Sequence, residues 1–411
     1  MARERVVVVG GGLTAARAVE SMREHGFDDE IAVVTEERRL PYERPPLSKG
    51  YLAGSDPSSV VYPLPARWYR EHDVDVRRGV RATAIDPSAR TVATDEGELA
   101  YDRLLLATGS SPRRFEGPGA GLRGVHVLRS LPDSTRLRTA LREGDRRVVV
   151  LGSGWIGLEV AAAARDYGNA VTVLGRSEVP LVGAVGRELG GMFAELHREH
   201  GVEVRNEVAV SAIEGVGRRV RGVVLGTGEE VPADLVVVGI GATPNVGLAA
   251  SAGLTVEDGI VTDASFRTSA DGVFAAGDVA NVFNPTLGHR LRVEHWANAE
   301  ASGRAVGRVL AGEVLEFDEI PYFYTDQYDL GMEYSGYGEL ADGADLVVRG
   351  DLAARECVAF WLREGRVVAG MNVNVWDVND QVQRLIRSGA VVDPVALADP
   401  DVPLDRIGAP A

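Results

Sequence analysis

The sequence predicts an α/β fold in which two similar parallel-sheet domains precede a smaller α+β domain. A buried strand, a glycine-rich turn, a helix and a second strand follow one another from Arg5 and again from Arg146. Each of these units is closed by a later apolar strand and a Gly/Pro turn, LLLATGSSPRR (104–114) and LVVVGIGATPN (235–245). The stretch CVAFWLREGRVVAGM (357–371) suggests antiparallel strands around a glycine turn.

The composition is that of an ordinary globular protein with several domains. Of the 411 residues, 45% are hydrophobic and 25% are charged, and the net charge of −16 argues against a nucleic-acid partner. No apolar run approaches the roughly 18 residues that a membrane-spanning helix needs. The single cysteine, Cys357, excludes an intrachain disulfide and fits a reducing compartment. We therefore expect a soluble, cytoplasmic protein with no nucleic-acid and no membrane partner.

The first repeated unit has the pattern of a dinucleotide-binding site. RVVVV (5–9) reads as a buried parallel strand, and Gly10-x-Gly12-x-x-Ala15 follows it directly. Gly10 permits a tight turn, Gly12 lets the backbone approach a pyrophosphate, and Ala15 lets the next helix pack on the strand. That helix offers the free N–H groups of its first turn to the phosphates. Glu36, about 20 positions on and directly after the next strand, is placed to bind ribose hydroxyls.

The second unit repeats this pattern with glycine at each of its three fixed positions. RRVVVL (146–151) leads into Gly152-x-Gly154-x-x-Gly157, and a helix and the strand AVTVL follow. Two complete patterns in one chain predict two dinucleotides, one for each unit.

The loop after AVTVL departs from the NAD pattern. An NAD-type site has an acid at this point to hold the 2′-hydroxyl of the adenosine ribose. Here the chain reads Gly175-Arg176-Ser177, and the nearest acid, Glu178, comes late. Because Arg176 is suited to clasp a 2′-phosphate, we expect NADPH to be accepted at least as well as NADH.

Two further stretches hold residues that could take part in binding or catalysis. DGVFAAGDVA (271–280) runs from an apolar strand into Asp278, which places an acid at a strand end beside a helix start. RPPLSKGYL (44–52) holds Lys49, the only lysine in the chain. Lysine is a compact point charge whereas arginine is a wide planar fork, so this position needs a compact cation in a tight space.

Together these motifs resemble those of the FAD-dependent pyridine-nucleotide oxidoreductases, whose fold is glutathione-reductase-like. Within that superfamily the chain resembles the ferredoxin reductases of the putidaredoxin-reductase type, which feed cytochromes P450 and Rieske oxygenases. The resemblance covers about residues 4–380, and its more specific parts are LPYERPPLSKGYL (40–52) and RVEHWANAEASG (292–303). IPYFYTDQYDL (320–330) resembles the opening of the C-terminal interface domain of these reductases.

The resemblance implies FAD at the first unit and a nicotinamide dinucleotide, NADPH and/or NADH, at the second; it implies no metal. The residues that it assigns to FAD are Gly10, Gly12, Thr14, Ala15, Glu36, Arg44, Lys49, Ala82, Thr108, Gly109, Arg129, Asp278 and Trp296. The residues that it assigns to the nicotinamide dinucleotide are Gly152, Gly154, Ile156, Gly157, Arg176 and Gly241.

The resemblance also implies catalytic roles for Lys49 and Glu159. The Lys49 ammonium would reach the N5/O4 edge of the flavin, where hydride transfer leaves negative charge that a fixed cation stabilises. Glu159, two residues after Gly157, would pair with Lys49 and keep it charged and aimed. Without the resemblance, Glu159 would be interpreted as a solvated acid on a helix.

The lack of a cysteine pair excludes thiol–disulfide chemistry. Disulfide reductases of this superfamily carry a Cys-x4-Cys pair beside the flavin, whereas Cys357 lies far along the chain and is expected to be a small buried hydrophobe. We therefore expect an NAD(P)H-dependent enzyme that passes electrons through FAD to a [2Fe–2S] ferredoxin, and through it to a monooxygenase or dioxygenase. Two alternatives share the flavin site: a flavoprotein like apoptosis-inducing factor, and an NAD(P)H diaphorase or oxidase without a ferredoxin partner.

The motifs also predict the domain boundaries. We expect an FAD-binding domain over residues 1–112 and 246–318, interrupted by an NAD(P)H-binding domain over 113–245. A C-terminal interface domain is expected over 319–411. Within it, the Asp- and Pro-rich residues from about 396 are expected to form a poorly ordered tail.

Overall fold

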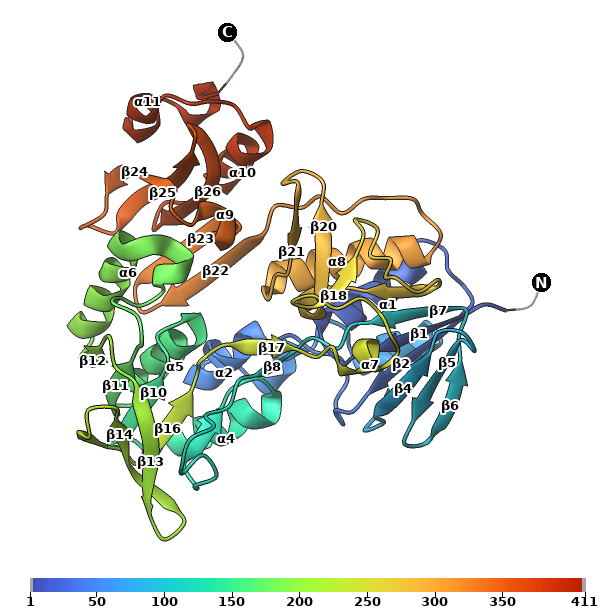
Figure 1. Cartoon of the computed structure of the whole chain (residues 1–411), viewed down its shortest axis with the longest axis horizontal. Helices are drawn as coiled ribbons and strands as arrows, with labels where there is room; N and C mark the ends of the chain where they lie inside the picture. The colour runs from blue at the N-terminus through green and yellow to red at the C-terminus, as the bar shows by residue number, and fades with distance from the viewer. Residues whose placement is uncertain (1–2, 409–411) are drawn as a thin grey trace. The chain divides into compact units, whose positions relative to one another are not determined.

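The computed structural model of the chain describes residues 3–408 (Figure 1). Contacts between residues divide the chain into two compact units. Unit 1 comprises the chain up to Arg44, Ser59–Ser111 and Thr243–Pro321; unit 2 comprises Pro45–Ser58, Pro112–Ala242 and the chain from Tyr322 onward. Every helix within residues 3–408 is too short or too polar to span a bilayer.

Unit 1 is built on a parallel sheet with the strand order β19-β7-β1-β2-β3. Its strands are β1 (Arg5–Val9), β2 (Glu30–Thr35), β3 (Val74–Arg78), β7 (Arg103–Leu106) and β19 (Val273–Ala275). Strand β1 is mostly valine, and its central residues are fully buried, as in strands that are covered on both faces. The strand order reverses at β1, and ligands of such sheets bind in the crevice outside the carboxyl ends of the strands at this point.

Smaller sheets and helices complete unit 1. The order β4-β5-β6 forms one small sheet and β18-β20-β21 another. Their strands are β4 (Ala82–Asp86), β5 (Thr91–Thr94), β6 (Gly97–Ala100), β18 (Ile260–Thr262), β20 (Ala280–Asn284) and β21 (His289–Leu291). The helices are α1 (Leu13–Glu24), α3 (Ala66–Glu71), α7 (Gly247–Ser251), the short 3-10 helix η3 (Gly277–Val279) and α8 (Trp296–Leu310). The strands β8 (Ser110–Pro112) and β17 (Ala242–Pro244) lie where the chain passes from one unit to the other.

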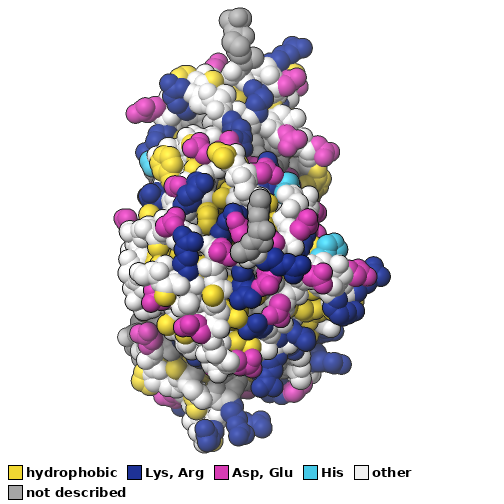
Figure 2. All heavy atoms as spheres, turned by 90° about the vertical axis from the view of Figure 1, so that its right-hand side faces the viewer, with side chains coloured by type: hydrophobic (Ala, Val, Ile, Leu, Met, Phe, Trp, Pro, Cys, Tyr) yellow, Lys and Arg dark blue, Asp and Glu magenta, His cyan; other side chains and the backbone are white. Residues whose placement is uncertain are grey.

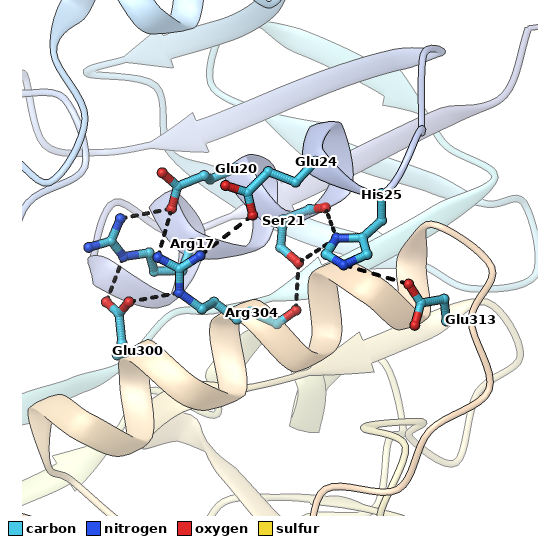
Figure 3. Close-up of polar contacts among 8 residues, drawn as sticks. All are labelled: Arg17, Glu20, Ser21, Glu24, His25, Glu300, Arg304 and Glu313. Atoms are coloured by element: carbon cyan, nitrogen blue, oxygen red, sulfur yellow. Dashed lines mark hydrogen bonds and ion pairs between the residues drawn. The ribbon is translucent and has the colours of Figure 1, made fainter.

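Helices α1 and α8 lie side by side in unit 1 and are joined by ion pairs (Figure 3). Arg17 of α1 pairs with Glu300 of α8 at 2.6 Å and with Glu20 at 2.8 Å. Arg304 of α8 pairs with Glu300 at 2.9 Å and with Glu20 at 3.3 Å. The Arg17, Glu20 and Glu300 side chains are only 15–19% exposed, so water screens these pairs less than it screens pairs on an open surface. The network fixes the helix that follows the first glycine turn.

The middle part of unit 2 repeats the plan with a parallel sheet in the order β12-β11-β10-β16-β9. Its strands are β9 (Val125–Val127), β10 (Arg147–Leu151), β11 (Ala170–Leu174), β12 (Val202–Arg205) and β16 (Leu235–Val238). A separate antiparallel sheet has the strands β13 (Val210–Val216), β14 (Arg219–Leu225) and β15 (Glu230–Pro232). The helices are η1 (Pro45–Leu47), α2 (Gly50–Ala53), α4 (Leu131–Leu141), α5 (Trp155–Asp166) and α6 (Val182–Glu199).

The rest of unit 2 is an antiparallel sheet with the order β22-β23-β26-β25-β24. Its strands are β22 (Tyr322–Gln327), β23 (Leu330–Gly336), β24 (Asp345–Asp351), β25 (Glu356–Arg363) and β26 (Arg366–Val373). Glu364 and Gly365 both have positive φ, at 52° and 72°, and form the predicted turn between β25 and β26. The helices are α9 (Gly338–Ala341), α10 (Asn379–Ser388), α11 (Pro394–Ala398) and η4 (Leu404–Arg406). The two five-stranded parallel sheets and the five-stranded antiparallel sheet of the C-terminal part confirm the predicted fold class.

The prediction of a poorly ordered tail is wrong for the residues up to 408. Leu397 of α11 is fully buried, and Leu404 is 8% exposed. The Arg349 guanidinium of β24 donates hydrogen bonds to four carbonyl oxygens, those of Leu397, Asp399, Pro400 and Val402. Asp and Pro made this segment look unable to fold, but the leucines between them pack on the domain and Arg349 satisfies the backbone carbonyls. Residues 409–411 of the predicted tail lie outside the described residues.

Candidate active site

The first glycine turn joins β1 to α1 at the carboxyl end of the unit 1 sheet. Gly10 has φ +147°, and a Cβ atom at this position would collide with the carbonyl oxygen of Ala107. Gly12 precedes α1 without a side-chain cap, and no atom lies within 4 Å of the place where its Cβ would be. The first turn of α1 therefore keeps uncapped N–H groups beside open backbone, which is the environment that a pyrophosphate requires.

The AAGD turn, residues 275–278, lies against the first turn of α1. Thr14 and Ala15 of that turn are buried. Gly277 approaches Thr14 so closely that a Cβ atom would collide with the Thr14 hydroxyl. The Gly277 N–H donates to the Ser302 hydroxyl of α8 at 3.2 Å, which fixes the turn from its other side. Asp278, the next residue, is 8% exposed and lies in η3.

Three further residues assigned to FAD lie at the ends of strands or in the loop after β2. Glu36 follows β2 directly, and its side chain is 70% exposed and 3.7 Å from Arg81. Arg44 donates a hydrogen bond to Glu37 at 2.9 Å, and its guanidinium lies 4.4 Å from the centre of the Tyr42 ring. Ala82 begins β4.

Thr108 and Gly109 form a turn after β7 that Asn245 fixes. The Thr108 hydroxyl donates to the Asn245 carbonyl at 2.9 Å, and the Asn245 side-chain amide donates to the Thr108 carbonyl at 2.8 Å. Gly109 has φ +63°. Asn245 was not predicted as a site residue, although it ends the LVVVGIGATPN stretch. The reciprocal bonds show that it sets the shape of the turn.

Trp296 and Arg129 complete the residues assigned to FAD, apart from Lys49. Trp296 begins α8, and its Nε1–H donates to a Glu43 carboxylate oxygen at 2.9 Å. Burial raises the pKa of Glu43, and the hydrogen bond from Trp296 opposes this effect. Arg129 lies in unit 2 between β9 and α4 and is half-buried.

The second glycine turn, between β10 and α5, has the same construction as the first. Gly152 has φ +105°, and a Cβ there would collide with a carbonyl oxygen that follows β16. Gly154 precedes α5 without a side-chain cap, and its Cβ position has no atom within 4 Å. At Gly157 a Cβ would collide with the Gly152 carbonyl, so only glycine lets α5 start this close to the turn. The turn therefore fits a second pyrophosphate.

Two more residues assigned to the nicotinamide dinucleotide lie near the ends of these elements. Ile156, in the first turn of α5, is 45% exposed and presents apolar surface. Gly241 follows β16 with φ +103°, a backbone conformation that favours glycine.

A side chain at the first position of the loop after β11 would crowd the side chain of Ser153. A Cβ atom at Gly175 would lie 2.6 Å from the Ser153 hydroxyl. Glu178, the nearest acid, pairs with Arg187 at 2.5 Å. Arg176 is exposed, and the contacts within residues 3–408 include no ion pair for its guanidinium.

Lys49 lies at the start of α2, in a segment that α4 holds. The Ser134 hydroxyl of α4 donates to the Leu47 carbonyl at 2.7 Å. The Tyr51 and Thr135 hydroxyls are 2.8 Å apart and share a hydrogen bond. Because these contacts lie on both sides of Lys49, they fix the backbone from which its side chain extends.

Lys49 forms the predicted ion pair with Glu159 of α5. The Nζ–Oε1 distance is 2.5 Å, and the two side chains are 20% and 4% exposed. The Ser48 hydroxyl donates to Oε2 at 2.5 Å and the Thr325 hydroxyl to Oε1 at 2.7 Å. A buried carboxylate is stable only when partners replace its lost hydration. Glu159 is therefore a buried ion-pair partner and not a solvated acid.

The Lys49 ammonium has two further neighbours, both on β22. The ammonium lies 5.7 Å from the centre of the Tyr324 ring, close to Asp326 of the same strand. Burial raises the pKa of Asp326, an effect that Lys49 opposes and Glu159 reinforces. One ammonium thus lies beside an aromatic ring and two acids.

Ser48 and Thr325 were missed as site residues. Ser48 is the neighbour of Lys49 in RPPLSK, and nothing local marks its hydroxyl as a donor. Thr325 did carry a signal, because β22 alternates: Thr325 and Gln327 are 1% exposed, whereas Tyr324 and Asp326 point the other way. Polar residues on the buried side of a strand indicate a buried polar network.

Comparisons with known proteins identify the family of this chain. Residues 4–303 match the family described as pyridine nucleotide-disulphide oxidoreductase, and residues 322–408 match the reductase C-terminal family. The chain belongs to the pyridine nucleotide-disulphide oxidoreductase family. It is 40% identical to the ferredoxin–NAD(+) reductase component of an anthranilate 1,2-dioxygenase system from Burkholderia cepacia, with 98% of this chain and 99% of the relative covered. It is 34% identical to putidaredoxin reductase from Pseudomonas putida, with 100% and 98% covered.

Solved structures support the same assignment. The covalent putidaredoxin reductase–putidaredoxin complex matches with a TM-score of 0.94 and 34% identity, covering 98% of each chain. The ferredoxin reductase of the CYP199A2 system from Rhodopseudomonas palustris matches with a TM-score of 0.93 and 33% identity, covering 99% of this chain and 100% of the other. The protein is therefore an FAD-dependent NAD(P)H oxidoreductase. Among residues 3–408, no group of three or more His, Cys, Asp or Glu side chains is arranged to hold a metal ion.

Proposed function

We propose that this protein oxidises NAD(P)H and passes the electrons through FAD to a [2Fe–2S] ferredoxin that serves a cytochrome P450 or a Rieske oxygenase. The observation that best supports this proposal is the buried Lys49–Glu159 pair, which supplies a fixed cation in a protein with one cysteine. That cysteine, Cys357, is 1% exposed within β25, and burial raises the pKa of its thiol to about 11. It is unsuited to thiol chemistry. The relatives named above support the ferredoxin partner.

The two glycine turns and the domains would divide the cofactors as follows. The first turn, with Gly10, Gly12 and the other unit 1 residues assigned to FAD, holds the ADP half of that cofactor. The second turn, in the 113–245 domain, holds the nicotinamide dinucleotide. The C-terminal domain from residue 319 supplies Thr325 to the carboxylate of Glu159.

Bound FAD supplies a hydride acceptor that can release electrons one at a time. The part of Lys49 is to hold positive charge where negative charge develops, since a preorganised cation needs no rearrangement during the reaction. The part of Glu159 is to pair with that ammonium and to fix its direction. Ser48 and Thr325 hold the carboxylate in turn.

Ferredoxin docking is proposed to depend on exposed arginines. Figure 2 shows acidic and basic side chains interspersed on the face that it presents, so docking depends on local groups and not on the net charge. Arg78 and Arg114 are exposed. Arg304 and Arg308 lie one helical turn apart on α8, but both pair with glutamates of unit 1. We propose that the protein works in the cytoplasm, because NAD(P)H is held inside the cell.

The test is NAD(P)H-driven reduction of cytochrome c by the FAD-loaded protein, with and without a [2Fe–2S] ferredoxin. The proposal expects little reduction without ferredoxin and a large increase when it is added. Equal rates in both reactions would indicate a diaphorase without a ferredoxin partner. A preparation that gains no flavin spectrum with FAD would contradict the cofactor assignment itself.

A further inference from the structure

We propose that Thr325, Gln327 and His197 form a directional hydrogen-bond chain that holds the Glu159 carboxylate, and through it the Lys49 ammonium, in place. The three are positioning residues, because they act through Glu159. This inference rests on the role proposed above for Lys49 and Glu159 and names the residues behind it.

The chain links three elements of unit 2. Thr325 of β22 donates to Glu159 Oε1 at 2.7 Å, and Gln327 Nε2 donates to Thr325 Oγ1 at 3.3 Å. His197 of α6 has its Nε2 atom 2.8 Å from Gln327 Oε1. Because Thr325 and Gln327 are two residues apart on a strand, both side chains lie on the same face. Strand β22 thus connects α5, which carries Glu159, to α6.

Every donor in the chain points toward Glu159. The Gln327 amide oxygen can only accept, so His197 Nε2 carries the proton and donates it. The other ring nitrogen, Nδ1, is then the acceptor for the Tyr328 hydroxyl at 3.4 Å. Hydrogen bonds that run in one direction polarise one another, so each link strengthens the donor that finally reaches the carboxylate.

The hydrogen-bond chain is buried away from water, so the loss of one of its partners costs free energy. Glu159, Thr325, Gln327 and His197 are each at most 5% exposed. Burial lowers the pKa of His197 to about 4, although the hydrogen bond to Gln327 opposes the shift. The ring is therefore neutral at ordinary pH and keeps one N–H for Gln327. A buried group that loses its partner has no water to replace it.

The lone lysine makes the chain directly observable. Lysine labelled with ¹³C and ¹⁵N gives one side-chain ammonium signal in NMR, that of Lys49, without any assignment. We expect Thr325→Val to shift this signal and to speed proton exchange with water, in the full chain both with and without FAD. Thr325→Ser keeps the hydroxyl and should retain the wild-type signal. Thr172→Val is the matched control, because Thr172 of β11 also donates to a glutamate, Glu203 at 3.0 Å, but at an exposed pair.

A variant of Gln327, which lies one hydrogen bond further from Glu159 than Thr325, tests whether the whole hydrogen-bond chain acts or only the Thr325 contact. Gln327→Leu should shift the Lys49 signal in the same direction as Thr325→Val and by a smaller amount. In stopped-flow measurements, Thr325→Val should slow flavin reduction about tenfold and leave the KM for the nicotinamide cofactor within about twofold, and Thr325→Ser should restore the rate.

The outcomes distinguish this inference from the proposed function. An unchanged Lys49 signal in Gln327→Leu would overturn the chain, and this variant decides alone if Thr325→Val does not fold. Lys49→Met is the separate test of the proposed function. If that variant reduces flavin at the wild-type rate, the role of Lys49 is wrong, while the NMR shifts still report on the chain.

Discussion

At the scale of single residues, the proposed chemistry depends first on Lys49. Its position is set by hydrogen bonds on both sides of it, and its charge is balanced by Glu159 at 2.5 Å. The carboxylate is buried and accepts hydrogen bonds from Lys49, Ser48 and Thr325. The one lysine of this arginine-biased chain thus lies beside Tyr324, Asp326 and Glu159.

Lys49→Ala should slow flavin reduction by about a hundredfold, since loss of one preorganised donor typically costs this much. FAD binding should change little, because the glycine turn and the AAGD turn of unit 1 are untouched. Stopped-flow reduction by NAD(P)H measures the rate, and the flavin content of the purified protein is the control. A rate within twofold of wild type would show that the lysine is incidental.

The second residue-scale prediction concerns Arg176. Its guanidinium is exposed after β11, in a loop whose first residue, Gly175, lies close to the Ser153 side chain. We expect NADPH to be accepted at least as well as NADH, with discrimination of about tenfold, the value of one charge-assisted bond. Arg176→Ala should raise the KM for NADPH and leave that for NADH nearly unchanged.

Steady-state kinetics with both cofactors provide the measurement for Arg176. Arg218→Ala, at an exposed arginine of the β13–β14 hairpin, is the control and should change neither KM. A wild-type preference of ten-fold or more for NADH would contradict this interpretation of the loop.

At the scale of elements, strands and turns place the reactive groups while helices hold them. The glycine turns fix the starts of α1 and α5, and α4 fixes the segment that carries Lys49. Strand β22 alternates between two environments and so supplies Thr325 to the buried side. The C-terminal segment, which carries α11 and η4, is held against strand β24 by hydrogen bonds from Arg349.

Arg349→Ala should destabilise the C-terminal part of the protein. Its guanidinium donates to the carbonyls of Asp399 and Val402 at 2.6 and 2.8 Å, and without it these groups lose a charged donor. We expect the free energy of unfolding to fall by about 2 kcal/mol, a typical value for hydrogen bonds to a charged group. Urea unfolding measures the change, and Arg406→Ala, at an exposed arginine, should have no such effect. Equal stability of both variants would show that the segment is held by its leucines alone.

The elements that sequence could predict are the ones with local patterns. Glycine spacing and apolar runs predict both strand–turn–helix units, the AAGD strand and the β25–β26 hairpin. All of them are present. The order of the C-terminal segment was not predictable, because Arg349 lies some fifty positions away from the carbonyls that it binds. Likewise, Thr325 reaches Glu159 across 166 positions, and no local pattern encodes such a contact.

At the scale of the whole molecule, bound FAD lets one chain accept a hydride from NAD(P)H and release single electrons. Each turn sits in its own parallel sheet, and each leaves an uncapped helix N-terminus for phosphates. A single buried cysteine means that the electrons leave from the flavin and not through a thiol pair. The partner that takes them must therefore bind directly to this protein.

Ferredoxin turnover should be sensitive to salt. Small iron–sulfur carriers are generally acidic, so exposed arginines such as Arg78 and Arg114 give the attraction that brings the partner in. Turnover should fall as salt rises through a few tenths molar, where the screening length drops below about 8 Å. The measurement is the rate of ferredoxin-dependent cytochrome c reduction against ionic strength, with flavin reduction by NAD(P)H as the control. A flat profile would argue for apolar docking.

The most direct test of the central claim is rapid mixing of the NAD(P)H-reduced protein with an oxidised [2Fe–2S] ferredoxin in the absence of oxygen. The flavin absorbance should recover while ferredoxin is reduced, one electron to each ferredoxin, and Cys357→Ser should behave as the wild type does. Flavin that stays reduced in the presence of ferredoxin, or a transfer that is lost in Cys357→Ser, would contradict direct passage of electrons from FAD to the partner.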